Sequence, residues 1–175
     1  MRYLFFDSDM TDNDIQAEYD IVGKDYQDLI RVCCKYSQVL SFVIMQNNVS
    51  LMNEIKTFEV TPDPLIFDHS VFYDTGHHQK PYKKFYKVCP EMCDALLNHT
   101  DSIFSWICNS KYNNPEDITF YRNDGSVFFG SIIHDGICMI SNREDEDINS
   151  IISNPLWIPE GKIKGYWKSY LNILK

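Results

Sequence analysis

The chain has 175 residues, with 25 acidic and 16 basic side chains and a formal net charge of −9 at pH 7. Apolar residues make up 44% of it and aromatic residues 14%, which excludes a chain that is disordered throughout and predicts a sizeable core. The length fits one domain over residues 1–175. No apolar run exceeds four residues, and the acidic N-terminal region has no pattern of an export signal, so we expect a cytoplasmic protein without membrane contact.

The cysteines are even in number, as in disulfide-stapled secreted domains. A chain of this size can form a stable hydrophobic core without disulfide bonds, so we expect reduced and mostly buried thiols. The six are Cys33, Cys34, Cys89, Cys93, Cys108 and Cys138.

The N-terminal third predicts two strands with a helix between them. Tyr3–Phe6 is a short apolar and aromatic run and predicts a strand. Apolar residues then recur at helical spacing from Tyr26, and Lys24 or Asp25 is expected to start a helix of about a dozen residues. Val39–Met45 is almost wholly apolar, which predicts a strand covered on both faces.

Prolines interrupt the middle of the chain. Residues 65–88 predict irregular structure or short strands, and the stretch Lys80–Lys87, where lysines alternate with aromatic residues, is typical of an exposed edge strand. The same pattern occurs in single-strand nucleic-acid binders, but a net charge of −9 argues against a nucleic-acid partner. Pro90 suits the first position of a further helix.

The clearest local pattern lies between Ile118 and Ile140. Three strand-like runs are separated by Asp124-Gly125 and Asp135-Gly136, pairs that favour tight turns, so we expect a three-stranded antiparallel meander. Helices are predicted after it, one behind the acidic run 144–147 and one over residues 163–174. The chain is therefore predicted to be α+β, mainly an antiparallel sheet with flanking helices.

One motif points to chemistry. Asp7-Ser8-Asp9-Met10-Thr11 follows the first strand and resembles the first motif of haloacid-dehalogenase-type phosphatases. That resemblance implies Asp7 as nucleophile and Asp9 as general acid/base beside Mg²⁺. The family also requires a doubly wound parallel sheet, which the antiparallel meander contradicts. The phosphatase is therefore the alternative hypothesis, and a solvated acidic turn is the simpler one.

Other catalytic or metal-binding patterns are weak. Cys89, Cys93, His99 and Cys108 could be zinc ligands, but the spacing of the first two suits a helix face better than a zinc knuckle. Cys89 and His134 could form a Cys–His pair, although nothing in their order fixes them together. We therefore predict no catalytic residue, no metal and no cofactor.

A second resemblance covers about a third of the chain. The quoted segments resemble immunity proteins of bacterial contact-dependent growth inhibition and polymorphic-toxin systems. They are Asn114–Arg122, Asp124–Phe129 and Ser131–His134, with Glu18–Ile21, Asp25-Tyr26 and Cys34–Ser37 earlier in the chain. The resemblance implies a protein that is not an enzyme and that occludes a toxin domain, often a basic nuclease. An acidic surface suits such a partner because it steers association.

Two acidic clusters are the candidate toxin-binding residues. One is a turn and the other precedes a predicted helix, and we expect them to form one face. They comprise Asp7, Asp9, Asp12 and Asp14, and Glu144, Asp145, Glu146 and Asp147. A regulatory or structural domain without a toxin partner is a third hypothesis.

Overall fold

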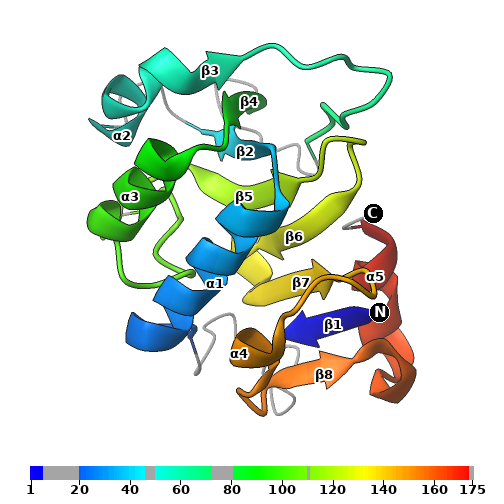
Figure 1. The fold of residues 1–175 in the computed structure, drawn as a ribbon. Helices are drawn as coiled ribbons and strands as arrows, with labels where there is room; N and C mark the ends of the chain where they lie inside the picture. The colour runs from blue at the N-terminus through cyan, green and yellow to red at the C-terminus, as the bar shows by residue number, and fades with distance from the viewer. Residues whose placement is uncertain (6–19, 46–49, 72–80, 110, 174–175) are drawn as a thin grey trace.

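An antiparallel sheet of eight strands organises the computed structural model, which describes residues 1–5, 20–45, 50–71, 81–109 and 111–173 (Figure 1). The strand order is β3-β4-β2-β5-β6-β7-β1-β8, and every pairing in it is antiparallel. The strands are β1 (Arg2–Phe5), β2 (Val39–Ile44), β3 (Glu59–Val60), β4 (Tyr82–Lys87), β5 (Glu116–Tyr121), β6 (Val127–Ile132), β7 (Ile137–Ser141) and β8 (Trp157–Pro159). The predicted α+β class is confirmed.

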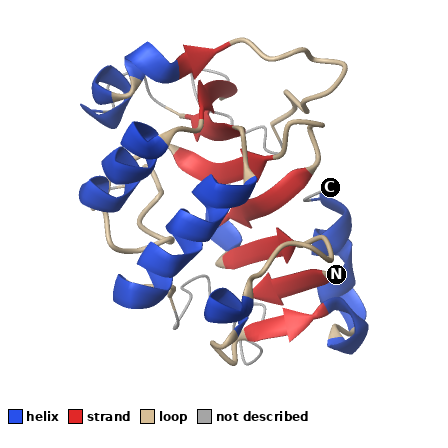
Figure 2. Cartoon of the chain, viewed as in Figure 1, coloured by secondary structure: helices blue, strands red, loops and turns tan. Residues whose placement is uncertain are grey.

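Helices cover both faces of the sheet unequally. Figure 2 shows the longer helices together on one side, while the C-terminal helical segment lies on the other side, beside the β1 and β8 end. The helices are α1 (Gly23–Tyr36), α2 (Ser50–Glu54), α3 (Pro90–His99), α4 (Asn149–Ile152) and α5 (Tyr170–Ile173). Within the described part of the chain, none of them has the length and apolar character needed to cross a bilayer.

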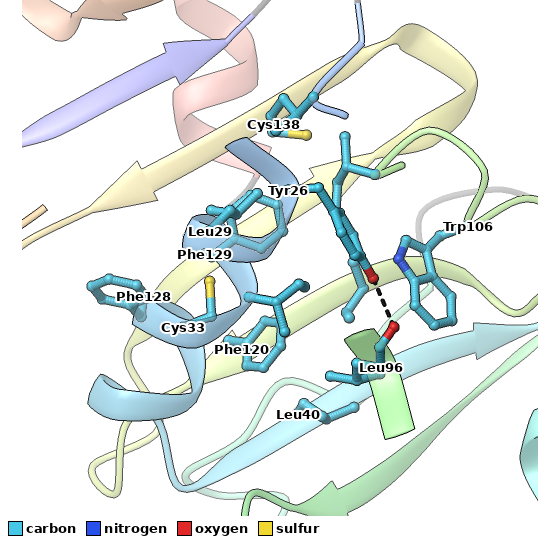
Figure 3. Close-up of a cluster of buried hydrophobic side chains, with 14 of the residues drawn as sticks. Tyr26, Leu29, Cys33, Leu40, Leu96, Trp106, Phe120, Phe128, Phe129 and Cys138 are labelled. Carbon is cyan, nitrogen blue, oxygen red and sulfur yellow. Dashed lines mark hydrogen bonds between the residues drawn. The ribbon is translucent and has the colours of Figure 1, made fainter. Parts of the chain in front are cut away.

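The main core lies between α1, α3 and the sheet (Figure 3). The apolar stripe of α1 places Tyr26, Leu29 and Cys33 against aromatic residues of β5 and β6, as its 3.6-residue periodicity requires. The buried Tyr26 hydroxyl donates a hydrogen bond to the Leu96 carbonyl of α3 at 3.0 Å. This bond satisfies the one polar atom that the stripe buries, and it ties the two helices together.

Two smaller clusters cover the opposite face. At the β1 end, Ile163 and Leu171 pack with Leu4 and Met139. At the β4 end, Phe67 packs edge-on to Tyr121, with ring centroids 5.7 Å apart. β2 therefore has apolar cover on both faces, as its continuous apolar sequence predicted.

The predicted meander is confirmed as β5, β6 and β7. Gly125 and Gly136 have φ angles of +79° and +63°, the left-handed conformation that the Asp-Gly pairs were expected to supply. A register shift between Phe120 and Tyr121 shows where the β5–β6 pair is irregular.

The lysine-rich stretch is not an edge strand, contrary to the prediction. β4 lies between β2 and β3, and it buries Phe85 and Tyr86. The Lys83 side chain is only 8% exposed and lies 3.8 Å from the Asp68 carboxylate. Phe85 and Tyr86 pack in clusters on opposite faces of the sheet, so the charge of the lysines did not indicate an unpaired strand.

The C-terminal part is less helical than predicted. The expected helix over 163–174 is a 3-10 segment over Gly165–Ser169 followed by α5, because Gly165 has a φ of +61° and interrupts a regular start. Similarly, the helix after the acidic run is α4, which has only four residues.

All six cysteines are free thiols, as predicted. Only Cys33 and Cys138 are fully buried, however. The other four are partly exposed, so the expectation of mostly buried thiols was wrong for them.

Candidate protein-binding site

The acidic run 144–147 borders a hollow in the described surface. It leaves the end of β7 and leads into α4, and the hollow has a volume of about 280 Å³. Residues 142 and 144–149 line it, together with Tyr3 and Ile152. Glu144, Asp145 and Asp147 are exposed, which leaves three carboxylates at the surface of this segment.

Glu146, the fourth acid of the run, points into the protein. Its side chain is 7% exposed and accepts hydrogen bonds from Nε and Nη2 of Arg122, both at 2.6 Å. The Arg143 amide donates a third bond to it at 2.6 Å. Burial opposes ionisation of this carboxyl, but the Arg122 and Arg143 bonds and charges outweigh it and lower the pKa of Glu146. Glu146 is therefore a structural anchor and no longer a candidate contact residue.

Arg122 anchors the acidic run to the sheet. Besides Glu146, its guanidinium donates to the carbonyls of Val127, at 2.9 Å, and Ser141. It also stacks over the Phe128 ring at 5.2 Å from the centroid. A bidentate arginine–carboxylate pair has a fixed geometry. Because it fixes Glu146, it also holds the neighbouring exposed acids in place.

Two further bonds fix the end of the run. The Asp147 amide donates to the Tyr36 hydroxyl of α1 at 3.0 Å, and the Asn149 amide donates to Asp147 Oδ1 at 3.0 Å. The hollow is thus lined by Tyr3 of β1, the segment after β7 and α4, and the bond to Tyr36 of α1 braces its acidic run.

Arg143, the basic residue next to the run, is engaged with another acid. Arg143 is exposed and forms an ion pair with Asp124, whose pKa is lowered by hydrogen bonds from Ser126 and Arg143. That pair adds no net charge to the surface. Glu144, Asp145 and Asp147 form no ion pair with a described lysine or arginine within 4.0 Å.

The other predicted cluster, Asp7, Asp9, Asp12 and Asp14, lies outside the described residues. β1 runs antiparallel to β7, so its last residue, Phe5, pairs with Cys138. The acidic run continues from Ser141, which pairs with Arg2 at the other end of β1. The described part of the chain therefore provides the 144–147 cluster alone.

The fold weakens the phosphatase hypothesis. The motif at Asp7 and Asp9 requires a parallel, doubly wound sheet around the strand before it. β1 instead pairs antiparallel with both β7 and β8. The phosphatase motif therefore occurs here without the parallel sheet that the phosphatase family requires.

The cysteine and histidine candidates have other partners. His99 Nε2 lies 2.8 Å from Asn114 Oδ1, and the His99 ring stacks on Trp106. His134 Nε2 lies 2.9 Å from Glu116 Oε2. Across the described ranges, no three His, Cys, Asp or Glu side chains are grouped so as to hold a metal ion.

The sequence did not single out Glu116, a fully buried acid on β5. Its Oε1 accepts a hydrogen bond from the Cys108 amide at 2.8 Å, while its Oε2 is hydrogen-bonded to Nε2 of the half-exposed His134. This hydrogen bond raises the pKa of His134, although partial burial opposes the change. The alternating pattern of β5 gave no sign that its first residue would be buried.

Comparison with known proteins gives no relative to set beside this site. No protein-family model, no curated protein and no solved structure matches the chain.

Proposed function

We propose that the chain is an immunity protein that binds a basic toxin domain of the nuclease type and blocks it stoichiometrically. The observation that carries the proposal is the braced acidic hollow, where Glu144, Asp145 and Asp147 face solvent while the Arg122–Glu146 pair holds their backbone. A nuclease surface is built to accept phosphates, and carboxylates in a fixed arrangement can compete for it.

The overall charge supports the same kind of partner. A net charge of −9 favours encounter with a positively charged protein and disfavours nucleic acid. The resemblance of the β5–β6 region to immunity proteins agrees with this role, which would be performed in the cytoplasm of the producing cell.

The test is co-expression with a basic toxin domain, which the proposal expects to be encoded next to the gene. The wild-type chain should restore growth and bind the purified domain one to one. Reversing Glu144, Asp145 and Asp147 to lysine should weaken binding by roughly 100-fold and abolish protection, since like charges then face each other. Glu54→Lys is the control for one charge reversal away from the hollow, because Glu54 is exposed on α2, near the opposite end of the sheet (Figure 1).

Three results would count against the proposal. Protection that survives the triple reversal would remove this surface from the mechanism. Turnover of a generic phosphoester with Mg²⁺ that is lost in Asp7→Asn would instead favour the phosphatase. A domain with a purely structural role should show neither protection nor turnover.

A further inference from the structure

The loop that follows β3 presents an apolar tip to solvent. The side chains of Leu65 and Ile66 form this tip, and the two residues are 92% and 50% exposed. Among the exposed large apolar residues of the described chain, they are the pair that is adjacent in sequence. Single exposed apolar residues are ordinary on a protein surface, so this pair is set apart by how firmly it is held and by what lies beside it.

The loop is firmly held although its tip is bare. The Asp63 carboxylate accepts a hydrogen bond from the Leu65 amide at 2.9 Å, and the Asp63 carbonyl accepts bonds from the next two amides at 3.0 and 2.9 Å. Phe67 is 7% exposed and packs edge-on to Tyr121. The loop thus buries Phe67 and holds Leu65 outward, so a partner that contacts Leu65 need not order the loop first.

The apolar tip and the acidic run 144–147 approach the same turn, the one between β5 and β6. Gly125 in this turn lies against the tip, since a Cβ atom on Gly125 would be 2.2 Å from the Ile66 carbonyl oxygen. Ser126 Oγ accepts a hydrogen bond from Nη2 of Arg143 at 3.0 Å, and Arg143 directly precedes the acidic run. Figure 1 shows the loop after β3 reaching this turn. The tip and the acidic run are therefore neighbours across a single turn.

The two features reach this turn from different sides. The loop covers the sheet face that carries the Phe67 cluster, whereas the acidic run is bonded to Tyr36 of α1 on the helical face. One partner can contact both only by binding across the end of the sheet. A protein–protein interface of ordinary size covers about 800 Å² on each partner, which is enough to span one turn and its flanks.

We propose that Leu65 and Ile66 are the apolar anchor of the toxin-binding surface. The basic toxin domain binds across the β5–β6 turn, with an apolar socket over the tip and cationic groups over the exposed acids of the run 144–147. This role rests on the proposed function, because the partner is the same basic domain. Charge attracts and orients that domain, and burial of the tip then slows its release.

Charge also identifies the occupant of the tip. The exposed acids beside it favour a partner with basic groups next to its apolar socket. A second copy of the chain is a poorer occupant, because two chains that each have a net charge of −9 repel each other.

The test is the binding kinetics of Leu65→Ala with the basic toxin domain. Leu65 is almost fully exposed, so the substitution should leave the unfolding temperature of the free chain unchanged. Dissociation should become roughly 10-fold faster, while association stays within about twofold of wild type, because the apolar contact forms after encounter. The same factor is expected at low and high salt, since ions do not screen apolar burial.

Val22→Ala is the matched control. Val22 is 52% exposed and precedes α1, whose start lies on the far side of the molecule from the loop (Figure 1). Its substitution also removes exposed apolar atoms, but it should leave both rate constants as in wild type.

The outcomes separate the anchor from the proposed function. Wild-type dissociation in Leu65→Ala, with binding still weakened by the triple charge reversal, would overturn the anchor alone. An equal change in Val22→Ala would overturn it as well. A free chain that forms a dimer in gel filtration, and that Leu65→Ala makes monomeric, would assign the tip to a second copy instead. A wild-type chain that binds no basic toxin domain would reject the proposed function and the anchor together.

Discussion

Arg122 bonds to β6, to β7 and to the acidic run, and a single buried charge thereby shapes the candidate surface. It bonds to the carbonyls of Val127 on β6 and Ser141 on β7 and to the Glu146 carboxylate. The guanidinium and the carboxylate are each 7% exposed, so each charge depends on the other. Removing one partner leaves the other buried without compensation.

Glu146→Gln should therefore destabilise the protein strongly. We expect a loss of about 3–5 kcal/mol in the free energy of unfolding, because the Arg122 charge stays buried after its counter-charge is removed. Urea denaturation at pH 7 measures this loss. The same substitution at the exposed Glu144 should change the free energy by less than about 0.5 kcal/mol. Equal effects at the two positions would contradict the buried pair.

His134 should give the stability a pH dependence of the opposite sense to that of an ion-paired carboxylate. Its hydrogen bond to Glu116 raises the folded-state pKa of His134 above the ordinary value of 6.5. Its contribution is therefore complete below about pH 6.5 and is lost as the pH rises through the raised value. Since His134 is half-exposed, solvent screening limits this contribution to about 1 kcal/mol or less.

Thermal unfolding of wild type and His134→Gln at pH 5.5 and pH 8.5 tests this dependence. The wild type should lose more stability than the variant between these pH values, and the difference isolates His134 from the other titrating groups. A difference of the opposite sign would mean that the histidine is neutral in the folded state across this range.

At the scale of single elements, the β5–β6 turn depends on Gly125. Its φ is +79°, and a Cβ atom there would collide with the carbonyl of Ile66 from the adjoining loop. Gly125→Ala should therefore cost roughly 1–3 kcal/mol through backbone strain and displacement of that loop. Gly161→Ala is the control, because a Cβ at Gly161 meets no atom within 4 Å and its φ is ordinary. Chemical denaturation of both variants should separate them clearly, and a neutral Gly125→Ala would show that the loop yields freely.

The elements that could be predicted are those with strong local patterns. α1 has a long apolar stripe, β2 a continuous apolar run, and the meander has two Asp-Gly turns. β3 and β8 have only two and three residues, too short for any periodicity to mark them. β4 was placed wrongly because the charge of its lysines was given more weight than its adjacent aromatic residues Phe85 and Tyr86, which are both buried.

The order of the strands in the sheet could not be predicted from local sequence patterns either. β1 lies between β7 and β8, and β2 pairs with β4 and β5, so the sheet combines strands from both ends of the chain. These contacts depend on which apolar faces meet in three dimensions. The candidate site shows the same limit, because Glu146 is indistinguishable in sequence from its exposed neighbours. Its partner Arg122 lies 24 residues away, beyond any local motif.

At the scale of the whole molecule, an uneven charge distribution should govern the rate of association with a basic partner. The three exposed acids near the hollow belong to a chain with a net charge of −9, so long-range attraction should accelerate encounter. We expect the association rate constant with the cognate toxin domain to fall by roughly 10-fold or more between about 0.02 and 0.5 M salt, because ions screen this attraction. The dissociation rate constant should change far less.

Stopped-flow binding across that salt range measures both rate constants. Glu54→Lys should retain nearly the wild-type slope, since it alters the net charge by the same amount as one reversal at the hollow but at the remote α2. Asp145→Lys should flatten the slope more, because its charge would lie within about one Debye length of the docked partner at physiological salt. If the two variants gave equal slopes, net charge alone would steer the encounter, and the hollow would have no special part in it.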